Sequence, residues 1–389
     1  MLMKTYKLGD ICTVVSGSTP KTDNPEFWNG DIKWITPAEI NKESYIINDT
    51  ERKITDVAVK KTGLSSFPTG TVLLSSRAPI GKVAIAGCEM YCNQGFKNLI
   101  CSDAINNKYL YWLLKSKTEF LNSLGRGATF KEISKAIVEN IEIRIPDISC
   151  QEKAVSQFEA ITEAARICQN ELNILNESIN ARFVEMFGDP VVNDRGWQKI
   201  TLLESLEAGR TVTYGIVQTG DEFENGIPVF RPIDIAGGHI PKREELKKTD
   251  PLISARYKRT LLKGNELLIT VRGSVGETFQ TTDEFEGCNV GRNIVPLVTD
   301  SNIVLQRFLQ ELFAQDAIKN WLKGITKGIA LQGLNMGEFK EMPVIAPPIT
   351  MQRAFVVFAL QVDKSKAVVQ SILDKLNTLL ASLMQEYFG

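Results

Sequence analysis

Apolar residues recur at alternating steps of three and four in two long stretches of the chain. The positions that define this repeat are Phe158, Ile161, Leu172, Leu175 and Ile179, and then Val362, Val369, Leu373, Leu376, Leu380 and Leu383. The spacing is typical of a coiled-coil seam rather than of a general amphipathic face. We expect two helices of about 35 residues, or ~50 Å at 1.5 Å per residue. They should pack antiparallel on each other, with pairing between two chains as the competing arrangement.

Each stretch has a clear beginning in the sequence. Pro146 precedes the first, Pro347 and Pro348 precede the second, and Ser149 or Thr350 is available as the helix cap. The expected rod then acts as a ruler that holds two domains at a fixed separation.

The segments before each helix have a different pattern. Short apolar runs at residues 71–75, 82–86, 266–270 and 293–297 are separated by Gly, Pro, Asn and Asp, which predicts strands joined by turns. One amphipathic helix is expected in each block, near residues 107–124 and 301–322. We therefore predict an α+β fold with two tandem, pseudo-symmetric β-rich domains, separated by two long antiparallel coiled-coil helices. The expected boundaries are 1–146 and 191–346 for the domains, and 147–190 and 347–389 for the helical spacers.

The two halves are copies of one another. Residues 127–188 align with residues 328–389 at a constant offset of 201. Upstream, residues 30–40 align with 225–235, residues 51–56 with 245–250, and Asn93-Gln-Gly with Asn289-Val-Gly. A period this long indicates a duplicated domain rather than a solenoid, whose repeats are about 20–50 residues long. Two similar domains suit a target that has two separated halves.

Composition narrows the class of protein. The chain is 43% hydrophobic and 23% charged, and no apolar run approaches the ~18 residues of a membrane span. Seven cysteines at irregular spacing indicate reduced thiols, so we expect a cytoplasmic protein with no membrane partner. A single histidine, His239, excludes His-based triads and two-His metal sites. The net charge is −1, but residues 242–263 carry eight basic groups against three acidic ones. Such a local patch can follow phosphates or form a solvated charged face.

One enzymatic pattern stays open. Asp234 with Glu245-x-Lys247, and Glu39 with Glu51-x-Lys53, fit a loose template for a Mg²⁺-dependent nuclease. The pattern recurs at matching positions of both halves, so a shared structural scaffold is a sufficient explanation for it. We predict no catalytic residue and no metal ligand in this chain.

Basic and amide side chains beside repeated glycines are the better candidates for function. Arg77 and Arg272 each begin an Arg-x3-Gly segment after a predicted strand. Glycine lets a backbone turn tightly or approach a phosphate, and Arg, Lys, Asn and Gln read guanine and adenine edges. The candidate DNA-binding residues are Lys21, Lys33, Arg77, Lys82, Asn93, Gln94, Lys97, Arg126, Arg210, Arg231, Arg272, Arg292 and Lys327.

Several motifs resemble a known family. Leu-Gly-Asp-Ile at 8–11, Ser-Gly-Ser-Thr-Pro-Lys at 16–21, residues 27–37 and Cys-Asn-Gln-Gly-Phe at 92–96 look like the target-recognition domain of type I restriction–modification DNA specificity subunits. Pro146 with Gln151, and Pro347 with Gln352, resemble the starts of the family's two repeated helical regions. The second domain departs from the first, with Gly-Arg-Thr-Val at 209–212 where the first has Gly-Ser-Thr-Pro at 17–20.

The resemblance implies a non-catalytic subunit that recognises a bipartite sequence in double-stranded DNA. Methyltransferase (modification) subunits and a restriction/translocase subunit would be its partners and would carry out methylation and restriction. S-adenosylmethionine, ATP and Mg²⁺ would bind to those partners, and no cofactor to this chain. The alternatives are a specificity subunit of a type IIB-like restriction system, a Mg²⁺-dependent nuclease, and a coiled-coil scaffold that does not contact DNA.

Overall fold

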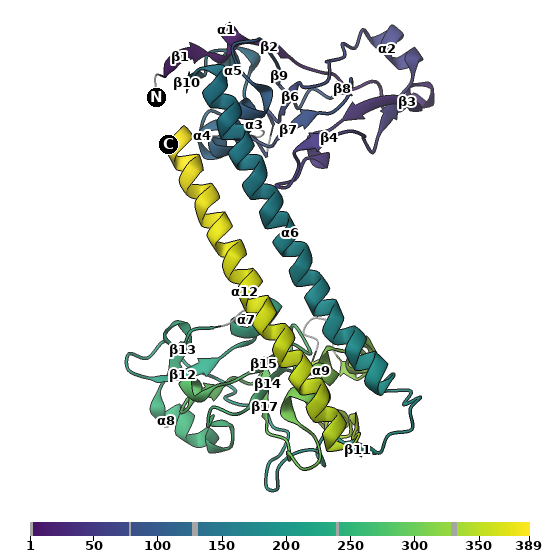
Figure 1. Cartoon of the computed structure of the whole chain (residues 1–389), viewed down its shortest axis with the longest axis vertical. Coiled ribbons are helices and arrows are strands. Elements are labelled where there is room, and N and C mark those ends of the chain that lie inside the picture. The colour runs from purple at the N-terminus through teal and green to yellow at the C-terminus, as the bar shows by residue number, and fades with distance from the viewer. Residues whose placement is uncertain (1–2, 78, 127–130, 239–240, 328–332) are drawn as a thin grey trace. The chain divides into compact units, whose positions relative to one another are not determined.

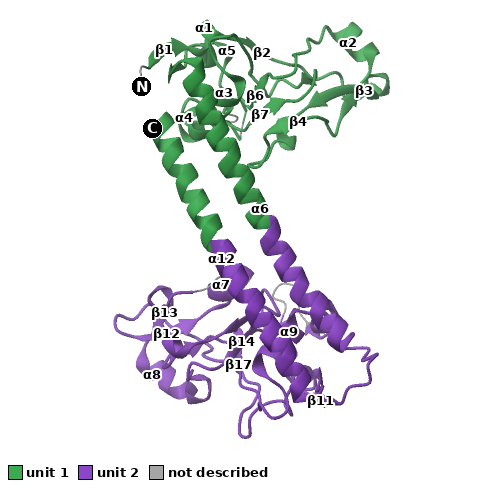
Figure 2. Ribbon diagram, in the orientation of Figure 1, with its two compact units in different colours: residues 1–169, 371–389 green, residues 170–370 purple. Residues whose placement is uncertain are grey.

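A computed structural model of the chain describes residues 3–77, 79–126, 131–238, 241–327 and 333–389. It divides into two compact units (Figure 2). Unit 1 comprises residues 1–169 and 371–389, and unit 2 comprises residues 170–370. Each unit therefore combines one β-rich block with one end of each long helix, whose course is labelled in Figure 1.

The described residues of unit 1 form ten strands and their connecting helices. The strands are β1 (Lys4–Lys7), β2 (Cys12–Val15), β3 (Trp28–Ile35), β4 (Ile46–Ile47), β5 (Lys53–Ile54), β6 (Val72–Leu74), β7 (Val83–Ala86), β8 (Tyr91–Cys92), β9 (Asn98–Cys101) and β10 (Glu142–Ile145). The helices are α1 (Leu8–Ile11), α2 (Asp56–Thr62), α3 (Asn107–Ser116), α4 (Thr118–Ser123), α5 (Lys135–Glu139) and the start of α6 (Ile148–Phe187), with 3-10 turns η1 (Pro25–Phe27) and η2 (Pro37–Glu39).

Three sheets organise these strands. A five-stranded sheet has the order β2-β9-β6-β7-β4, a three-stranded sheet has the order β5-β3-β8, and β1 pairs with β10. The buried strands β6 and β7 and the apolar face of α3 form the main core of unit 1. The predicted runs at 71–75 and 82–86 and the predicted helix near 107–124 are thus confirmed, although the helix breaks at Lys117 into α3 and α4.

Unit 2 repeats this plan. Its strands are β11 (Lys199–Thr201), β12 (Ile227–Phe230), β13 (Lys247–Thr249), β14 (Leu267–Thr270), β15 (Thr278–Gln280), β16 (Asn289–Val290), β17 (Ile294–Leu297), β18 (Thr326–Lys327), β19 (Gly333–Leu334) and β20 (Pro343–Ile345). Its helices are α7 (Pro232–Ile235), α8 (Pro251–Ser254), α9 (Gln306–Ala314), α10 (Asp316–Gly324), α11 (Met336–Lys340) and the start of α12 (Ile349–Phe388), with 3-10 turns η3 (Ala236–Gly238), η4 (Arg243–Glu245), η5 (Ala255–Thr260) and η6 (Asp283–Phe285). The sheet orders are β15-β14-β17, β13-β12-β16, β11-β20 and β18-β19.

Matching strand pairs fix which residues correspond in the two units. Trp34 pairs with Tyr91 in parallel, and Val229 pairs with Asn289 in the same way. Lys33 faces Lys53, and Pro228 faces Lys248. The offset of 195 expected for residues 30–40 is therefore confirmed by β3 and β12. Two other alignments were wrong: residues 51–56 are shifted by one, and residues 93–95 correspond to 291–293 rather than to 289–291.

The long helices α6 and α12 have 40 residues each, or about 60 Å of helix. They are longer than expected, because both begin directly after the proline segment and continue to a phenylalanine. The cap of α6 is Asp147 rather than Ser149, since Asp147 Oδ1 accepts a hydrogen bond from Cys150 N at 2.9 Å. No helix of the described residues is both long and apolar enough to cross a membrane.

The two helices pack within one chain and run antiparallel. In unit 1, Phe158 of α6 contacts Tyr387 near the end of α12, with ring centroids 5.7 Å apart. In unit 2, Phe183 near the end of α6 contacts Phe355 near the start of α12, at 5.5 Å. The predicted seam is confirmed, because all of its positions are buried or partly buried: Phe158, Ile161, Leu172, Leu175, Ile179, Val362, Val369, Leu373, Leu376, Leu380 and Leu383.

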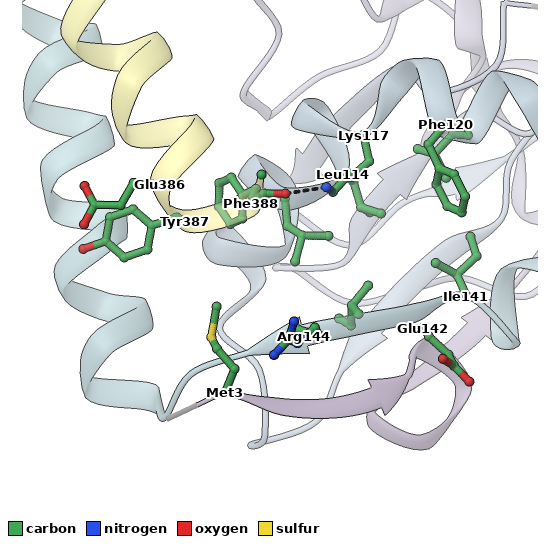
Figure 3. Close-up of a pocket in the computed structure, with 14 residues that line it drawn as sticks. Met3, Leu114, Lys117, Phe120, Ile141, Glu142, Arg144, Glu386, Tyr387 and Phe388 are labelled. Carbon is green, nitrogen blue, oxygen red and sulfur yellow. Dashed lines mark hydrogen bonds between the residues drawn. The ribbon is translucent and has the colours of Figure 1, made fainter. Parts of the chain in front are cut away.

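The end of α12 is held in unit 1 beside a pocket of about 460 Å³. Figure 3 shows Lys117, at the junction of α3 and α4, donating a hydrogen bond to the carbonyl oxygen of Phe388. The Phe388 ring packs on Tyr109 and Phe158, with centroids 5.2 and 5.6 Å apart. Together these contacts fix the last turn of the helix to the core of unit 1.

One glutamine joins each long helix to its unit. Gln151 is fully buried, accepts a hydrogen bond from Asn106 N at 2.8 Å and donates to Pro146 O at 2.9 Å. Gln352 does the same in unit 2, between Leu305 N and Pro347 O. The helix start is therefore attached to the preceding segment and to the loop before α3 or α9.

Candidate nucleic-acid interface

The same hairpin loop occurs once in each unit. It connects β6 to β7 in unit 1 and β14 to β15 in unit 2, and it ends at Gly81 (φ 87°) or Gly276 (φ 92°). Gly81 N donates to Ser75 O at 3.1 Å, and Gly276 N donates to Thr270 O at 2.9 Å. The left-handed backbone at the end of the loop requires glycine, which explains the repeated Arg-x3-Gly spacing.

The arginines at the start of these loops, Arg77 and Arg272, are both exposed. Arg77 Nε lies 2.9 Å from Glu132 Oε2, and Lys97 Nζ lies 3.2 Å from Glu132 Oε1. Gly333 occupies the position of Glu132 in unit 2, because Arg272 forms the same backbone bridge to it. The Arg272 guanidinium is therefore not held by an equivalent carboxylate.

Glu132 is an ionised centre of the unit 1 loop. Burial raises the pKa of its carboxyl, but hydrogen bonds from Arg77 and Lys97 outweigh burial and hold the pKa below its ordinary value. Lys97 itself is only 7% exposed. We therefore assign Lys97 a role in positioning Glu132 and Arg77, rather than a direct contact with a ligand.

A second repeated feature is the turn after β8 and β16. Asn93 N donates to Ile35 O at 3.2 Å, and Gly291 N donates to Phe230 O at 3.0 Å. The exposed residue that follows is Gln94 in unit 1 and Arg292 in unit 2. Asn93 itself shapes the turn, since its Oδ1 accepts from Gly95 N at 2.9 Å. The structure thus places two side chains that can read bases at one equivalent position.

Four other candidates are engaged inside their units. Lys33 Nζ donates to Asn48 O at 2.7 Å, and Lys82 Nζ donates to Pro37 O at 2.9 Å. Arg231 pairs with Asp234 at 2.9 Å, and Arg210 lies 3.7 Å from the buried carboxylate of Glu266. These contacts stabilise loops and helix ends, so a structural role is the simpler assignment for all four.

The remaining candidates lie at the surface or at the edge of the described residues. Lys21 and Arg126 are exposed, and Arg126 directly precedes residues 127–130, which lie outside the description. Lys327 ends β18, and its side chain is also outside the described part. The exposed candidates in the described chain are therefore Lys21, Arg77, Gln94, Arg126, Arg272 and Arg292, although Arg77 is paired with Glu132.

The basic patch of residues 242–263 divides in the structure. Arg243 donates to the carbonyl oxygen of Glu286 at 2.8 Å, and Lys247 donates to that of Gly220 at 2.6 Å. By contrast, Arg256, Lys258 and Arg259 of η5 are exposed. Their charges can follow a phosphate backbone without breaking an internal contact.

The nuclease template does not form a metal site. Asp234 is bound by Arg231, and Glu245 Oε1 lies 3.6 Å from Lys242 Nζ. Glu39 Oε1 accepts from Thr36 N, and its Oε2 accepts from Glu51 N, each at 2.8 Å. Within the described ranges, no group of three His, Cys, Asp or Glu side chains could hold a metal ion. The carboxylates instead cap short helices in both units.

Sequence reasoning missed one aromatic cluster on strand β3. The guanidinium of Arg52 lies 3.8 Å above the Trp28 ring, and Trp28 contacts Trp34 edge to face at 5.1 Å. Both tryptophans belong to residues 27–37, one of the segments that carry the family resemblance. Nothing local in the sequence, however, indicates which groups accept hydrogen bonds from their indole N–H groups.

Comparison with known proteins identifies the family. The model of the type I restriction modification DNA specificity domain matches residues 2–177 and again residues 195–378. The chain is 44% identical over 172 residues to the type I restriction enzyme MjaIX specificity subunit of Methanocaldococcus jannaschii, covering 43% of this chain and 40% of that protein. It is 21% identical over 314 residues to the EcoBI specificity subunit of Escherichia coli, covering 74% of this chain and 66% of that protein. The chain thus matches less than two thirds of the length of these curated relatives.

Solved structures share the fold. The specificity subunit from M. genitalium superposes with a TM-score of 0.60 at 15% identity, covering 100% of this chain and 96% of that one. A chain from a structure on complex assembly and conformational transition of the type I restriction–modification system gives a TM-score of 0.62 at 18% identity, covering 99% of this chain and 97% of that one. The two matches to the family model together span most of the residues of this chain. The chain therefore belongs to the type I restriction–modification DNA specificity family.

Proposed function

We propose that this chain is the sequence-recognition subunit of a type I restriction–modification complex, and that it performs no catalysis itself. Each unit would read one half of a bipartite double-stranded DNA target. The observation that carries the proposal is the repeated arginine loop, with exposed Arg77 in unit 1 and exposed Arg272 in unit 2. Arginine is the side chain most often used to read guanine in the major groove.

Differences between the equivalent positions support two different half-sites. Gln94 and Arg292 occupy the same place in the turn after β8 and β16, yet they favour different bases, since glutamine suits adenine and arginine suits guanine. Glu132 holds Arg77, whereas the equivalent Gly333 leaves Arg272 without that partner.

We infer that methyltransferase (modification) subunits bind the long helices, and that a restriction/translocase subunit joins the complex. Several apolar side chains on the outer faces of α6 and α12 are exposed, among them Ile174 (64%) and Val368 (61%). They continue as stripes, with Ile167 seven residues before Ile174 and with Ile372 and Leu379 after Val368. Exposed apolar stripes of this kind favour a protein partner. S-adenosylmethionine, ATP and Mg²⁺ would then bind to the partner subunits rather than to this chain.

The test begins with the target sequence. Mapping methylated adenines in the source genome should yield a motif of two short half-sites separated by variable bases. The chain assembled with its modification subunits should bind a duplex carrying that motif more tightly than a scrambled duplex.

Arg272→Ala should then weaken binding to the target by about 1–3 kcal/mol and relax specificity at one position, if this arginine reads a base. Arg144→Ala is the matched control, because Arg144 is an exposed arginine on β10, outside both the arginine loops and the long helices. A wild-type complex that binds target and scrambled DNA equally would overturn the proposed function.

A further inference from the structure

Each unit has an exposed loop that passes over the strand before the Gln94 or Arg292 turn. We call residues 17–24 the first loop and residues 215–224 the second loop. A Cβ on Gly17 would lie 1.8 Å from Cys92 O, and a Cβ on Gly215 would lie 1.8 Å from Val290 O. The loops therefore cross equivalent strands at an equivalent point, and only glycine permits the approach. The true counterpart of Gly17 is Gly215, not Gly209 as the sequence motif indicated.

The first loop is anchored by two indole N–H groups. Trp34 Nε1 donates to Ser18 O at 3.2 Å, and Trp28 Nε1 donates to Lys21 O at 3.1 Å. Trp34 is 1% exposed, so its ring is fixed in the core. The guanidinium of Arg52 covers the outer face of Trp28. Two rigid rings thus set the backbone path of the loop.

The second loop is anchored at the corresponding place by different chemistry. Thr249 Oγ1 donates to Thr219 O at 2.6 Å, and Lys247 Nζ donates to Gly220 O at 2.6 Å. Both side chains come from β13, the counterpart of β5 and its preceding residue. The strand register makes Lys247 the equivalent of Arg52. Equivalent sheets therefore hold both loops, but through different strands: tryptophans of the middle strand β3 in unit 1, and side chains of the edge strand β13 in unit 2.

Each loop also contacts the turn that carries the candidate reading residue. Thr19 Oγ1 donates to Gln94 Oε1 at 2.5 Å, which leaves the amide N–H groups of Gln94 available as donors. Arg292 N donates to Ile216 O at 2.8 Å. Loop and turn are therefore hydrogen-bonded to each other in each unit, and they carry the exposed residues Lys21 and Gln94 in unit 1 and Arg292 in unit 2.

We propose that these two loops form part of the base-reading surface, and that Trp28 and Trp34 in unit 1 and Lys247 and Thr249 in unit 2 are positioning residues that set sequence discrimination. This inference rests on the proposed function. A reading group discriminates only if it is held near its productive geometry, and a loop ordered before binding does not lose that freedom on the DNA. Releasing an anchor lets the loop adapt to a mismatched base pair, so binding to the wrong sequence improves relative to the target.

The experiment compares variants that lose one anchoring donor each. Trp28→Phe keeps an aromatic ring under Arg52 but removes the N–H, and Lys247→Met keeps the length of the side chain but removes the ammonium. Trp197→Phe is the matched control, because Trp197 Nε1 also donates to a backbone carbonyl, Phe187 O at 2.9 Å, away from both loops. Dissociation constants are measured for the mapped target and for duplexes with single base changes in either half-site, using the complex with its modification subunits.

Trp28→Phe should reduce discrimination by roughly 3- to 10-fold, as the loss of one hydrogen bond implies, and only in the half-site read by unit 1. Lys247→Met should do the same in the other half-site only. Trp197→Phe should lower the melting temperature and leave both discrimination ratios unchanged.

Two results would overturn the inference. In the first, Trp28→Phe behaves like Trp197→Phe and shifts only the melting temperature, which makes the tryptophan purely structural. In the second, Lys247→Met weakens binding to all sequences alike and lowers the salt dependence, which makes Lys247 a phosphate contact. A wild-type complex without any sequence preference would instead refute the proposed function, so the two failures are distinguishable.

Discussion

Gln352 offers a direct test of how the long helix is joined to unit 2. Its side chain is fully buried and makes three hydrogen bonds to backbone groups: it accepts from Leu305 N at 2.9 Å and donates to Ile303 O at 3.0 Å and Pro347 O at 2.8 Å. Gln352→Ala removes all three bonds at once. At about 1 kcal/mol each, the expected loss of stability is about 3 kcal/mol.

The expected loss of stability does not exceed this value, because the carbonyl oxygens that lose their donor can be hydrated. A cavity of about 460 Å³ is lined by Ile303 and Pro347, the two residues whose carbonyl oxygens accept hydrogen bonds from this glutamine. Water can enter there and bind the two carbonyl oxygens, so they need not stay unsatisfied. The Leu305 amide loses its acceptor in the same change, which should appear as faster hydrogen exchange at that position.

The assay is thermal or urea denaturation of the chain, with Gln361→Ala as the matched control. Gln361 is exposed on the same helix, so this variant makes an identical change of composition without breaking a buried contact. For a unit of about this size, 3 kcal/mol corresponds to a fall of about 6–12 °C in melting temperature.

Gln151→Ala should show a similar loss in unit 1, since Gln151 makes the equivalent contacts with Asn106 N and Pro146 O. If Gln352→Ala melts within about 0.5 kcal/mol of Gln361→Ala, the helix is not held by this glutamine. Unchanged exchange at Leu305 would refute the reasoning as well.

Three further predictions concern charge, thiols and helix length. Burial raises the pKa of Glu159, but hydrogen bonds from Lys108 and Tyr45 outweigh burial and lower this pKa below its ordinary value. The ionised carboxylate therefore stabilises the fold above the ordinary glutamate pKa of about 4.3, and this stabilisation is lost as the pH falls below it. In thermal melts, the difference in stability between wild type and Glu159→Gln should shrink between pH 7 and about pH 3.5. Cys12 and Cys101 face each other on the antiparallel strands β2 and β9, where opposed Cα atoms are about 4.5–5.5 Å apart, a separation that a disulfide can span. Excess oxidised glutathione should therefore convert this pair to a disulfide. Mass spectrometry would detect the bond as the loss of two hydrogens, and Cys12→Ser should not show it. One heptad added to both α6 and α12 lengthens each helix by about 10 Å and keeps the seam in register. The complex should then prefer a target whose spacer is longer by about three base pairs. A folded variant that methylates only the original spacing would contradict the idea that the helices set the spacing.

The sequence predicted the long helices and the buried strands well, because their patterns are local. Apolar seam positions such as Leu172 recur every three or four residues, and a short run such as residues 267–269 is apolar throughout. The registers of short strands were less predictable. β16 has only two residues, and the Asn-x-Gly motif at 289–291 resembles the one at 93–95 although it lies two residues away from the equivalent turn.

The sequence alone also does not show which of the candidate basic side chains are available to bind a ligand. Sequence alone cannot separate Lys82 or Lys97 from Arg272, because each is a basic residue beside a predicted strand. What separates them is distant in the chain: Pro37 O for Lys82 and Glu132 for Lys97. These partners occupy the ammonium groups, whereas Arg272 lies over a glycine that offers no side chain. Only the fold reveals which charges remain available for a ligand.

The two units share their framework but differ in the side chains that anchor their loops. The hairpins that end at Gly81 and Gly276 keep the same backbone hydrogen bonds, and Gln151 and Gln352 keep the same contacts, so the scaffold is equal in the two units. The anchors beneath the loops are not equal, since tryptophans serve in one unit and Lys247 with Thr249 in the other. If the chain reads two different half-sites, as proposed, its reading loops need to differ while its framework stays the same. Placing the difference in the loop anchors, on β3 in unit 1 and on β13 in unit 2, meets both requirements, because the hairpins and the glutamine contacts are the same in the two units whichever anchor is present.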